Sequence, residues 1–142
     1  MWQPTRVEQD RLNKVAELEA LGIDLYPARV QRTHTTAEAL AAYEKAEAAN
    51  PESPEEIAVT VCGRIRRANI KGKVAFMHIE DEHGRIQLFF RINDVGEEAY
   101  EPVRQKLIEV DDFIQASGTM MRTKAGEISV RVQAYQLLAK SL

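Results

Sequence analysis

A phenylalanine stands among polar residues in the stretch GKVAFMHIEDEHGRIQLFF, residues 72–90. This stretch reads as two strands around the polar turn EDEHG, and side chains alternate between the two faces of a strand. One face is then apolar, and the other carries Phe76, His78, Glu80, Arg85, Gln87 and Phe89. An exposed ring can stack on a nucleobase, and a neighbouring amide can donate to and accept from the base edge. The pattern therefore indicates base binding by Phe76 and Gln87.

Charged residues near this hairpin can supply further contacts to a nucleic acid. Arg64 projects from the outer face of the preceding strand and can donate to a carbonyl or phosphate oxygen. Glu127 follows the turn TKAG and can accept a hydrogen bond from a base N–H. The segment GRIRRANIKGK carries five cations and no acid, which is a local basic patch. We expect further contacts to nucleic acid from Arg66, Lys71, Lys73 and Arg85.

Each of these residues also has an ordinary structural interpretation. Phe76 can be covered by N-terminal helices, and Glu127 can be a turn residue paired with Lys124. Arg64 and Gln87 are common on solvated strands. No single one of these residues is evidence for nucleic-acid binding. Their combination on one face of the predicted strands favours binding of single-stranded RNA or DNA.

Two helices are predicted before the strands. In RVEQDRLNKVAELEALGID, the apolar residues Val15, Leu18 and Leu21 are spaced three apart, and Gly22 fits a helix C-terminus. Thr35 and Glu38 fit a capping box for a second, alanine-rich helix that ends near NPESP. Because its apolar face is weak, the pair should pack on a neighbouring domain or on a partner chain.

From Ile57 the apolar period changes to two, which predicts a first strand. The hairpin supplies strands two and three. A helix is predicted over EEAYEPVRQKLI, with Pro102 near its first turn or splitting it. Strands four and five are predicted over DDFIQASGTMMRT and EISVRVQAYQLL. This order predicts a mainly β fold, a five-stranded OB-fold barrel with a helix between strands 3 and 4. We expect residues 1–56 to form an N-terminal helical extension and residues 57–142 the OB-fold domain.

Composition restricts the class of protein. The 142 residues include one cysteine, Cys62, so no internal disulfide is expected, and no apolar run approaches the ~20 residues of a membrane span. The start MWQPTRVEQD resembles neither a secretion signal nor a transit peptide, so a cytoplasmic protein is expected. Net charge is −3, but residues 1–56 carry six cations against eleven acids and residues 57–142 thirteen against eleven. The predicted barrel is therefore the more basic half.

The sequence resembles the N-terminal anticodon-binding domain of bacterial-type lysyl-tRNA synthetases, which are class II aminoacyl-tRNA synthetases. The similar segments cover nearly the whole chain: LGIDLYP, RTHTTAE, GRI, GK followed by Phe76, GRIQLFF, DVGEE, RTKAGEISV and LLAKSL. The resemblance implies that the barrel binds a U-rich anticodon, with Phe76 stacking on the central base and Gln87 bonding to its edge. It also implies roles for Arg64 and Glu127, and a homodimer in the full-length enzyme.

The chain departs from the family pattern in two respects. Ala68 and Asn69 replace two basic residues and Lys71 replaces a methionine, while EVDDFIQ stands where a glycine-containing run is usual. No class II motif that binds ATP is present, so this chain alone is not expected to aminoacylate tRNA. ATP, magnesium and lysine would bind a catalytic domain absent from this chain, and no cofactor is expected for the chain itself.

The alternatives to this interpretation are a metal-dependent or other enzyme, a sequence-tolerant single-strand binder and a dimerisation module. His34, His78, His83 and Cys62 have poor spacing for a metal site, and no phosphate-binding loop or nucleophile motif occurs. A sequence-tolerant single-strand binder would use the same barrel, ring and basic patch. A dimerisation module would use the helices, and this role is compatible with anticodon binding.

Overall fold

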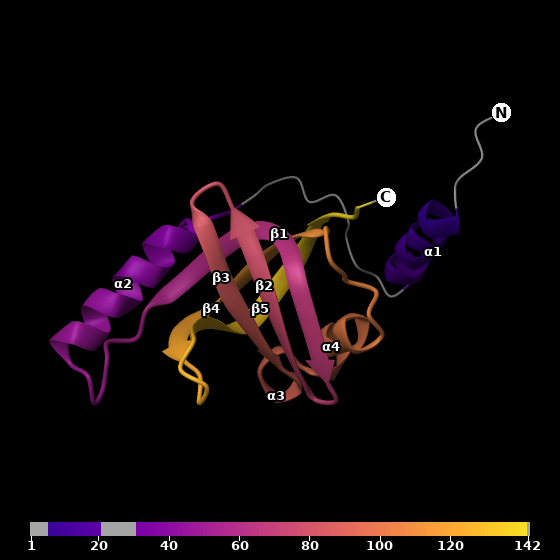
Figure 1. The fold of residues 1–142 in the computed structure, drawn as a ribbon. Helices are drawn as coiled ribbons and strands as arrows, with labels where there is room; N and C mark the ends of the chain where they lie inside the picture. The colour runs from indigo at the N-terminus through magenta and orange to yellow at the C-terminus, as the bar shows by residue number, and fades with distance from the viewer. Residues whose placement is uncertain (1–5, 21–30, 142) are drawn as a thin grey trace.

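The computed structural model describes residues 6–20 and 31–141 (Figure 1). Its helices are α1 (Arg6–Ala20), α2 (Thr36–Ala49), α3 (Ile92–Val95) and α4 (Glu97–Arg104). Its strands are β1 (Ala58–Lys71), β2 (Val74–Asp81), β3 (Gly84–Arg91), β4 (Phe113–Arg122) and β5 (Ile128–Ala139). None of the helices described is long and apolar enough to cross a membrane.

The five strands form a closed barrel in the order β1-β2-β3-β5-β4, so the predicted OB fold is confirmed. Neighbouring strands are antiparallel except β3 and β5, which pair in parallel between residues 87–89 and 129–131. We call this short parallel pairing the β3–β5 seam. The helices α3 and α4 lie between β3 and β4 in the chain and cover one end of the barrel (Figure 1).

The long strand β1 belongs to two pairings. Its first half, from Ala58 to Arg64, pairs with β4, and its second half, from Arg64 to Lys71, pairs with β2. A Cβ atom at Gly63 would lie 2.8 Å from the Glu80 carbonyl oxygen, so the glycine permits the close approach of β2 where the pairing changes. An irregularity between Ile65 and Arg67 shifts the register beyond this point. The shift determines which basic residues of β1 share a face with Phe76.

The alternation predicted for the hairpin is confirmed. Ala75, Met77 and Ile79 are buried on the core side of β2, and Ile86, Leu88 and Phe90 are buried on the core side of β3. Burial of these side chains stabilises the barrel through the removal of apolar surface from water. The hairpin is therefore fixed in register, because a slip by one residue would expose this entire set.

Helix α2 packs beside the barrel at the β2–β3 turn, and its capping box between Thr35 and Glu38 is present as predicted. Asp81 accepts hydrogen bonds from the Thr36 amide and hydroxyl at 2.8 Å, and also from the amides of His83 and Gly84. Burial alone would raise the pKa of Asp81, but these donors outweigh it and lower that pKa. One carboxylate therefore joins the start of α2 to the tip of the hairpin.

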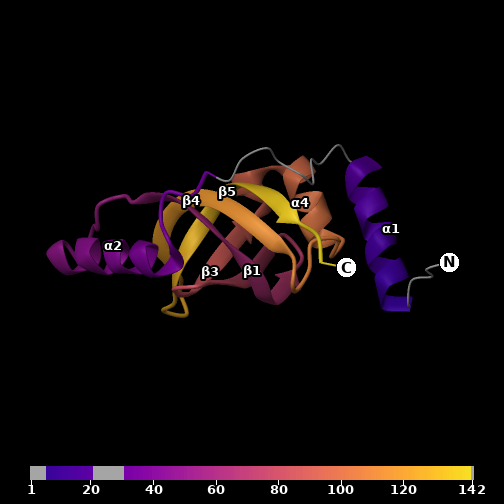
Figure 2. The ribbon, with the colours of Figure 1, turned by 90° about the horizontal axis from the view of Figure 1, so that it is seen from above.

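Helix α1 lies on the opposite side of the barrel from α2 (Figures 1 and 2). Leu18 is buried, and Lys14 forms an ion pair with Glu109 at 3.0 Å. Arg11 donates to the Ser141 hydroxyl at 2.7 Å, so α1 contacts the chain next to its C-terminal end. Both α1 and α2 therefore contact residues of the 57–142 segment of the same chain, in agreement with the first of the two expected packing modes, whereas packing on a partner chain stays a prediction.

Several sequence expectations need correction or lie outside the described residues. The basic segment GRIRRANIKGK continues β1 as far as Lys71, so most of its cations lie on a strand. The helix predicted over residues 97–108 ends at Arg104 with Pro102 inside it, and the short α3 was not predicted. Leu21 and Gly22 lie outside the described residues. The division into domains at residue 56 stays a prediction.

Candidate nucleic-acid interface

Two aromatic rings form the centre of the outer face of the hairpin. Phe76 and Phe89 are partners in the register of β2 and β3, and their rings are stacked with centroids 4.9 Å apart and planes within 6°. Both rings are partly exposed, and neither is covered by α1 or α2. The alternative in which the N-terminal helices bury Phe76 is therefore wrong.

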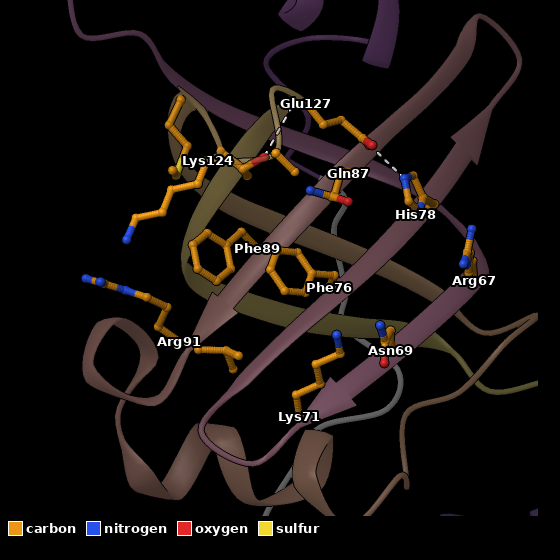
Figure 3. A pocket seen from close by; sticks show the side chains of 14 residues that line it. Arg67, Asn69, Lys71, Phe76, His78, Gln87, Phe89, Arg91, Lys124 and Glu127 are labelled. Carbon is orange, nitrogen blue, oxygen red and sulfur yellow. Dashed lines mark hydrogen bonds and ion pairs between the residues drawn. The ribbon is translucent and has the colours of Figure 1, made fainter.

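The rings line a groove of about 820 Å³, which we call the barrel groove (Figure 3). Its walls come from the second half of β1, the outer face of β2 and β3, and the turn between β4 and β5. The lining residues are Arg67, Asn69, Lys71, Val74, Phe76, His78, Gln87, Phe89, Arg91, Met121, Thr123, Lys124, Ala125 and Glu127. The groove is open to solvent along the rings, so a flat ligand can reach them from outside.

A chain of hydrogen bonds orients the polar residues above the rings. The buried amide of Gln87 donates from Nε2 to the Ser129 hydroxyl at 2.9 Å, and that hydroxyl donates to the Glu127 carbonyl at 3.2 Å. His78 lies beside Gln87 across the strands, and its Nε2 bonds to the Glu127 carboxylate at 2.7 Å. A carboxylate can only accept, so the imidazole is the donor. Glu127 therefore pairs with His78. The alternative in which Glu127 is a turn residue paired with Lys124 is wrong.

Four cations line the groove, Arg67, Lys71, Arg91 and Lys124, against one carboxylate, Glu127. The groove is thus basic on a chain whose net charge is −3. Such a concentration of cations attracts phosphates and makes binding depend on ionic strength.

An acidic residue beside the groove reduces the charge that Arg91 presents. Asp94 accepts bidentate hydrogen bonds from both Arg131 and Arg91, with N–O distances from 2.7 to 3.1 Å. These guanidinium groups hold the pKa of Asp94 far below its usual range. Asp94 therefore stays ionised and holds both arginines at the α3 end of the groove.

Two turns at the edges of the groove are held by contacts to other elements. Gly72, with φ +63°, permits the turn between β1 and β2, and the Tyr100 hydroxyl donates to its carbonyl at 2.9 Å. On the other side, Arg122 donates to the Gly126 carbonyl and pairs with Glu47 of α2. These contacts fix the position of both turns relative to the rings.

The structure brings together half of the residues proposed from sequence. Phe76, Gln87, Glu127 and Lys71 line the barrel groove, whereas Arg64, Arg66, Lys73 and Arg85 do not. Arg64 lies over the Phe113 ring, 4.5 Å from its centroid. Arg66 pairs with Glu80 and Asp111, and Arg85 also pairs with Glu80. Contact of any of these residues with RNA stays a prediction.

Several residues of the groove have no role predicted from the sequence. The alternation from Gln87 places Phe89 and Arg91 on the same face, and the alternation from Phe76 places His78 there. Arg67 and Asn69 carry no such signal, because the register shift after Ile65 changes which residues of β1 face the groove. In the described segments, no three His, Cys, Asp or Glu side chains gather as metal ligands.

Comparison with known proteins agrees with this geometry. A family model described as an OB-fold nucleic acid binding domain, the tRNA anticodon type, matches residues 59–138. The chain belongs to this family. The match spans all of β2, β3 and β4 and most of β1 and β5, so it contains every strand that builds the barrel groove.

Similar curated proteins are lysine–tRNA ligases. That of Roseiflexus castenholzii is 47% identical over 96% of this chain, that of Chloroflexus aurantiacus 43% over 96%, and that of Clostridium tetani 38% over 94%. The chain spans 27%, 26% and 25% of the lengths of these three relatives. The similarity covers the helices and the barrel alike.

Proposed function

We propose that the barrel groove binds the anticodon loop of a lysine tRNA and reads its uridines. The observation that carries this proposal is the partly exposed Phe76–Phe89 stack beside the oriented amide of Gln87. A base stacked on an exposed ring gains ~1–3 kcal/mol whatever its identity, so identity must be read at its edge. Gln87 supplies both a donor and an acceptor at that edge.

Other groove residues bind a second base and the phosphates in this proposal. The Glu127 carboxylate oxygen that does not bond to His78 accepts from a base N–H at a second position. Lys71 at the end of β1 and Lys124 in the β4–β5 turn lie on either side of the rings (Figure 3). In this proposal both contact phosphates that flank the stacked base. Phosphate contacts position the strand without reading sequence.

The lysine–tRNA ligases similar to this chain are much longer than it is, which supports a role within a larger protein. In this proposal the chain delivers tRNA to a catalytic domain elsewhere in the protein, which binds ATP, magnesium and lysine and joins lysine to tRNA. We also propose that the whole protein is a cytoplasmic homodimer.

The proposal is tested by titrating the chain with two RNA stem-loops that share one stem. One carries a UUU anticodon, and in the other the three anticodon bases are cytidines. We expect at least tenfold tighter binding of the uridine loop, because each lost edge contact leaves a polar group of the groove unpaired. Equal affinities would favour the sequence-tolerant single-strand binder, and absence of binding to both loops would contradict any role of the groove in RNA binding.

A further inference from the structure

The orientation of the Gln87 amide determines which pyrimidine it can read. Uracil presents an N3–H donor beside a carbonyl acceptor, whereas cytosine presents an N3 acceptor beside an amino donor. An amide whose oxygen faces N3 therefore fits uracil, and the same amide turned over fits cytosine. Phe76 cannot make this distinction, because stacking is tolerant of base identity.

Ser129 favours one of these two orientations. Its hydroxyl has one proton, which it donates to the Glu127 carbonyl, so toward Gln87 it can only accept. The Gln87 amide nitrogen must therefore face Ser129. Its oxygen Oε1 has no hydrogen-bond partner among the described residues, and the second Nε2 proton is also available to a ligand in the groove.

The opposite orientation loses one hydrogen bond. If the Gln87 oxygen faced Ser129, the serine proton would turn to it and leave the Glu127 carbonyl. That carbonyl would keep its bond from the Thr123 amide at 2.9 Å, so no buried group would be stranded. The loss of one net hydrogen bond corresponds to a population ratio of about fivefold between the two orientations.

We infer that Ser129 is a specificity-determining residue, which makes the groove prefer uridine over cytidine by holding the Gln87 amide in the orientation that uracil needs. Ser129 is fully buried and touches no base itself, so it acts as a positioning residue. The inference rests on the proposed function, because it concerns the base that stacks in the groove.

The test measures the affinity of the Ser129→Ala variant for stem-loops with uridine or cytidine at the central anticodon position. Without the hydroxyl both orientations become about equally populated. We expect affinity for the uridine loop to fall by less than twofold, affinity for the cytidine loop to rise about threefold, and the ratio to fall about fivefold. A tighter complex with the wrong base cannot result from damage to the fold.

Two variants serve as controls. Ser117→Ala removes another serine hydroxyl of the barrel, which bonds to Thr60 away from the groove, and should leave the uridine-to-cytidine ratio unchanged. In a Gln87→Ala background, Ser129→Ala should no longer change the ratio, because no amide remains to be oriented. An unchanged ratio in the Ser129→Ala single variant, or a change that persists without Gln87, would overturn the inference.

A measurement on the unaltered chain is independent of variant folding and of RNA binding. Of the two Gln87 Nε2 protons, the one bonded to Ser129 should exchange with solvent more slowly than the side-chain amide protons of the exposed Gln133. Exchange as fast as that of Gln133 would overturn the inference. If the chain binds neither loop while Gln87 is protected, the proposed function fails and the orientation by Ser129 stands.

Discussion

Replacement of Phe76 by alanine should separate RNA affinity from stability. The lost base stacking amounts to ~1–3 kcal/mol, which weakens stem-loop binding by roughly 5- to 150-fold. The variant also loses its stack on Phe89, worth about 0.5–1.5 kcal/mol of folding free energy for an aromatic pair. For a chain of this size that loss lowers Tm by roughly 2–6 °C. Fluorescence anisotropy with the uridine stem-loop and a thermal melt measure the two effects.

The matched control is Phe113→Ala, because Phe113 is another partly exposed ring of the barrel and packs against Arg64 outside the groove. It should lower Tm by a similar amount and leave RNA affinity within twofold. If Phe76→Ala lowered Tm with unchanged affinity, Phe76 would be a structural residue only. If both variants weakened RNA binding equally, the loss would be a general consequence of destabilisation.

Three further variants test the edge contact, the phosphate contact and Asp94, the acid beside the groove. Gln87→Glu should weaken both loops, and the uridine loop by about 1 kcal/mol more, because a carboxylate can donate neither to the uracil carbonyl nor to cytosine N3 and has no amide orientation for Ser129 to select; equal losses would contradict an edge contact. Lys71→Ala should weaken all stem-loops about equally and reduce the salt slope by roughly one, whereas Lys45→Ala on α2 should change neither. Asp94→Asn should lower stability at neutral pH by about 1.5–3 kcal/mol through the loss of charged hydrogen bonds, and should tighten RNA binding at low salt by freeing Arg91. Because the pKa of Asp94 is lowered on folding, its stabilisation is complete above the unfolded carboxyl pKa of ~3.9 and is lost as pH falls below it. The difference in Tm between this variant and the unaltered chain should therefore shrink below about pH 4, and a difference independent of pH would contradict the ion-pair explanation.

The fold could be predicted because local signals agree with it. Strict alternation in β2 and β3 identifies both the core face and the outer face, and Thr35 with Glu38 identifies the start of α2. The strand pairings that close the barrel could not be predicted from local alternation. That Gln87 lies beside Ser129 depends on where β5 meets β3, and residues 42 positions apart carry no local signal for that register.

Which arginine of β1 lines the groove also could not be predicted from local sequence. Arg66 and Arg67 are adjacent identical residues, and strict alternation from Ile65 favours Arg66 for the outer face of β1. The structure places Arg67 in the groove, because the Asp111–Asp112 turn engages Ile65: its amide donates to the Asp112 carbonyl and its carbonyl accepts from the Asp111 amide, both at 2.8 Å. Beyond that point the register of β1 shifts, and Arg66 turns toward Asp111. A contact far along the chain therefore decides which arginine meets the ligand.

The β3–β5 seam also determines when the site exists during folding. A nascent chain that has finished the β2–β3 hairpin already has both aromatic rings, but Ser129 and Glu127 arrive only with the last strand. Pairings between distant segments form late, since loop closure must precede them. A ligand held on both sides of the seam binds the closed barrel and not the open one, so it favours closure by mass action. The amides of residues 87–89 and 129–131 are accordingly where bound RNA should slow hydrogen exchange most.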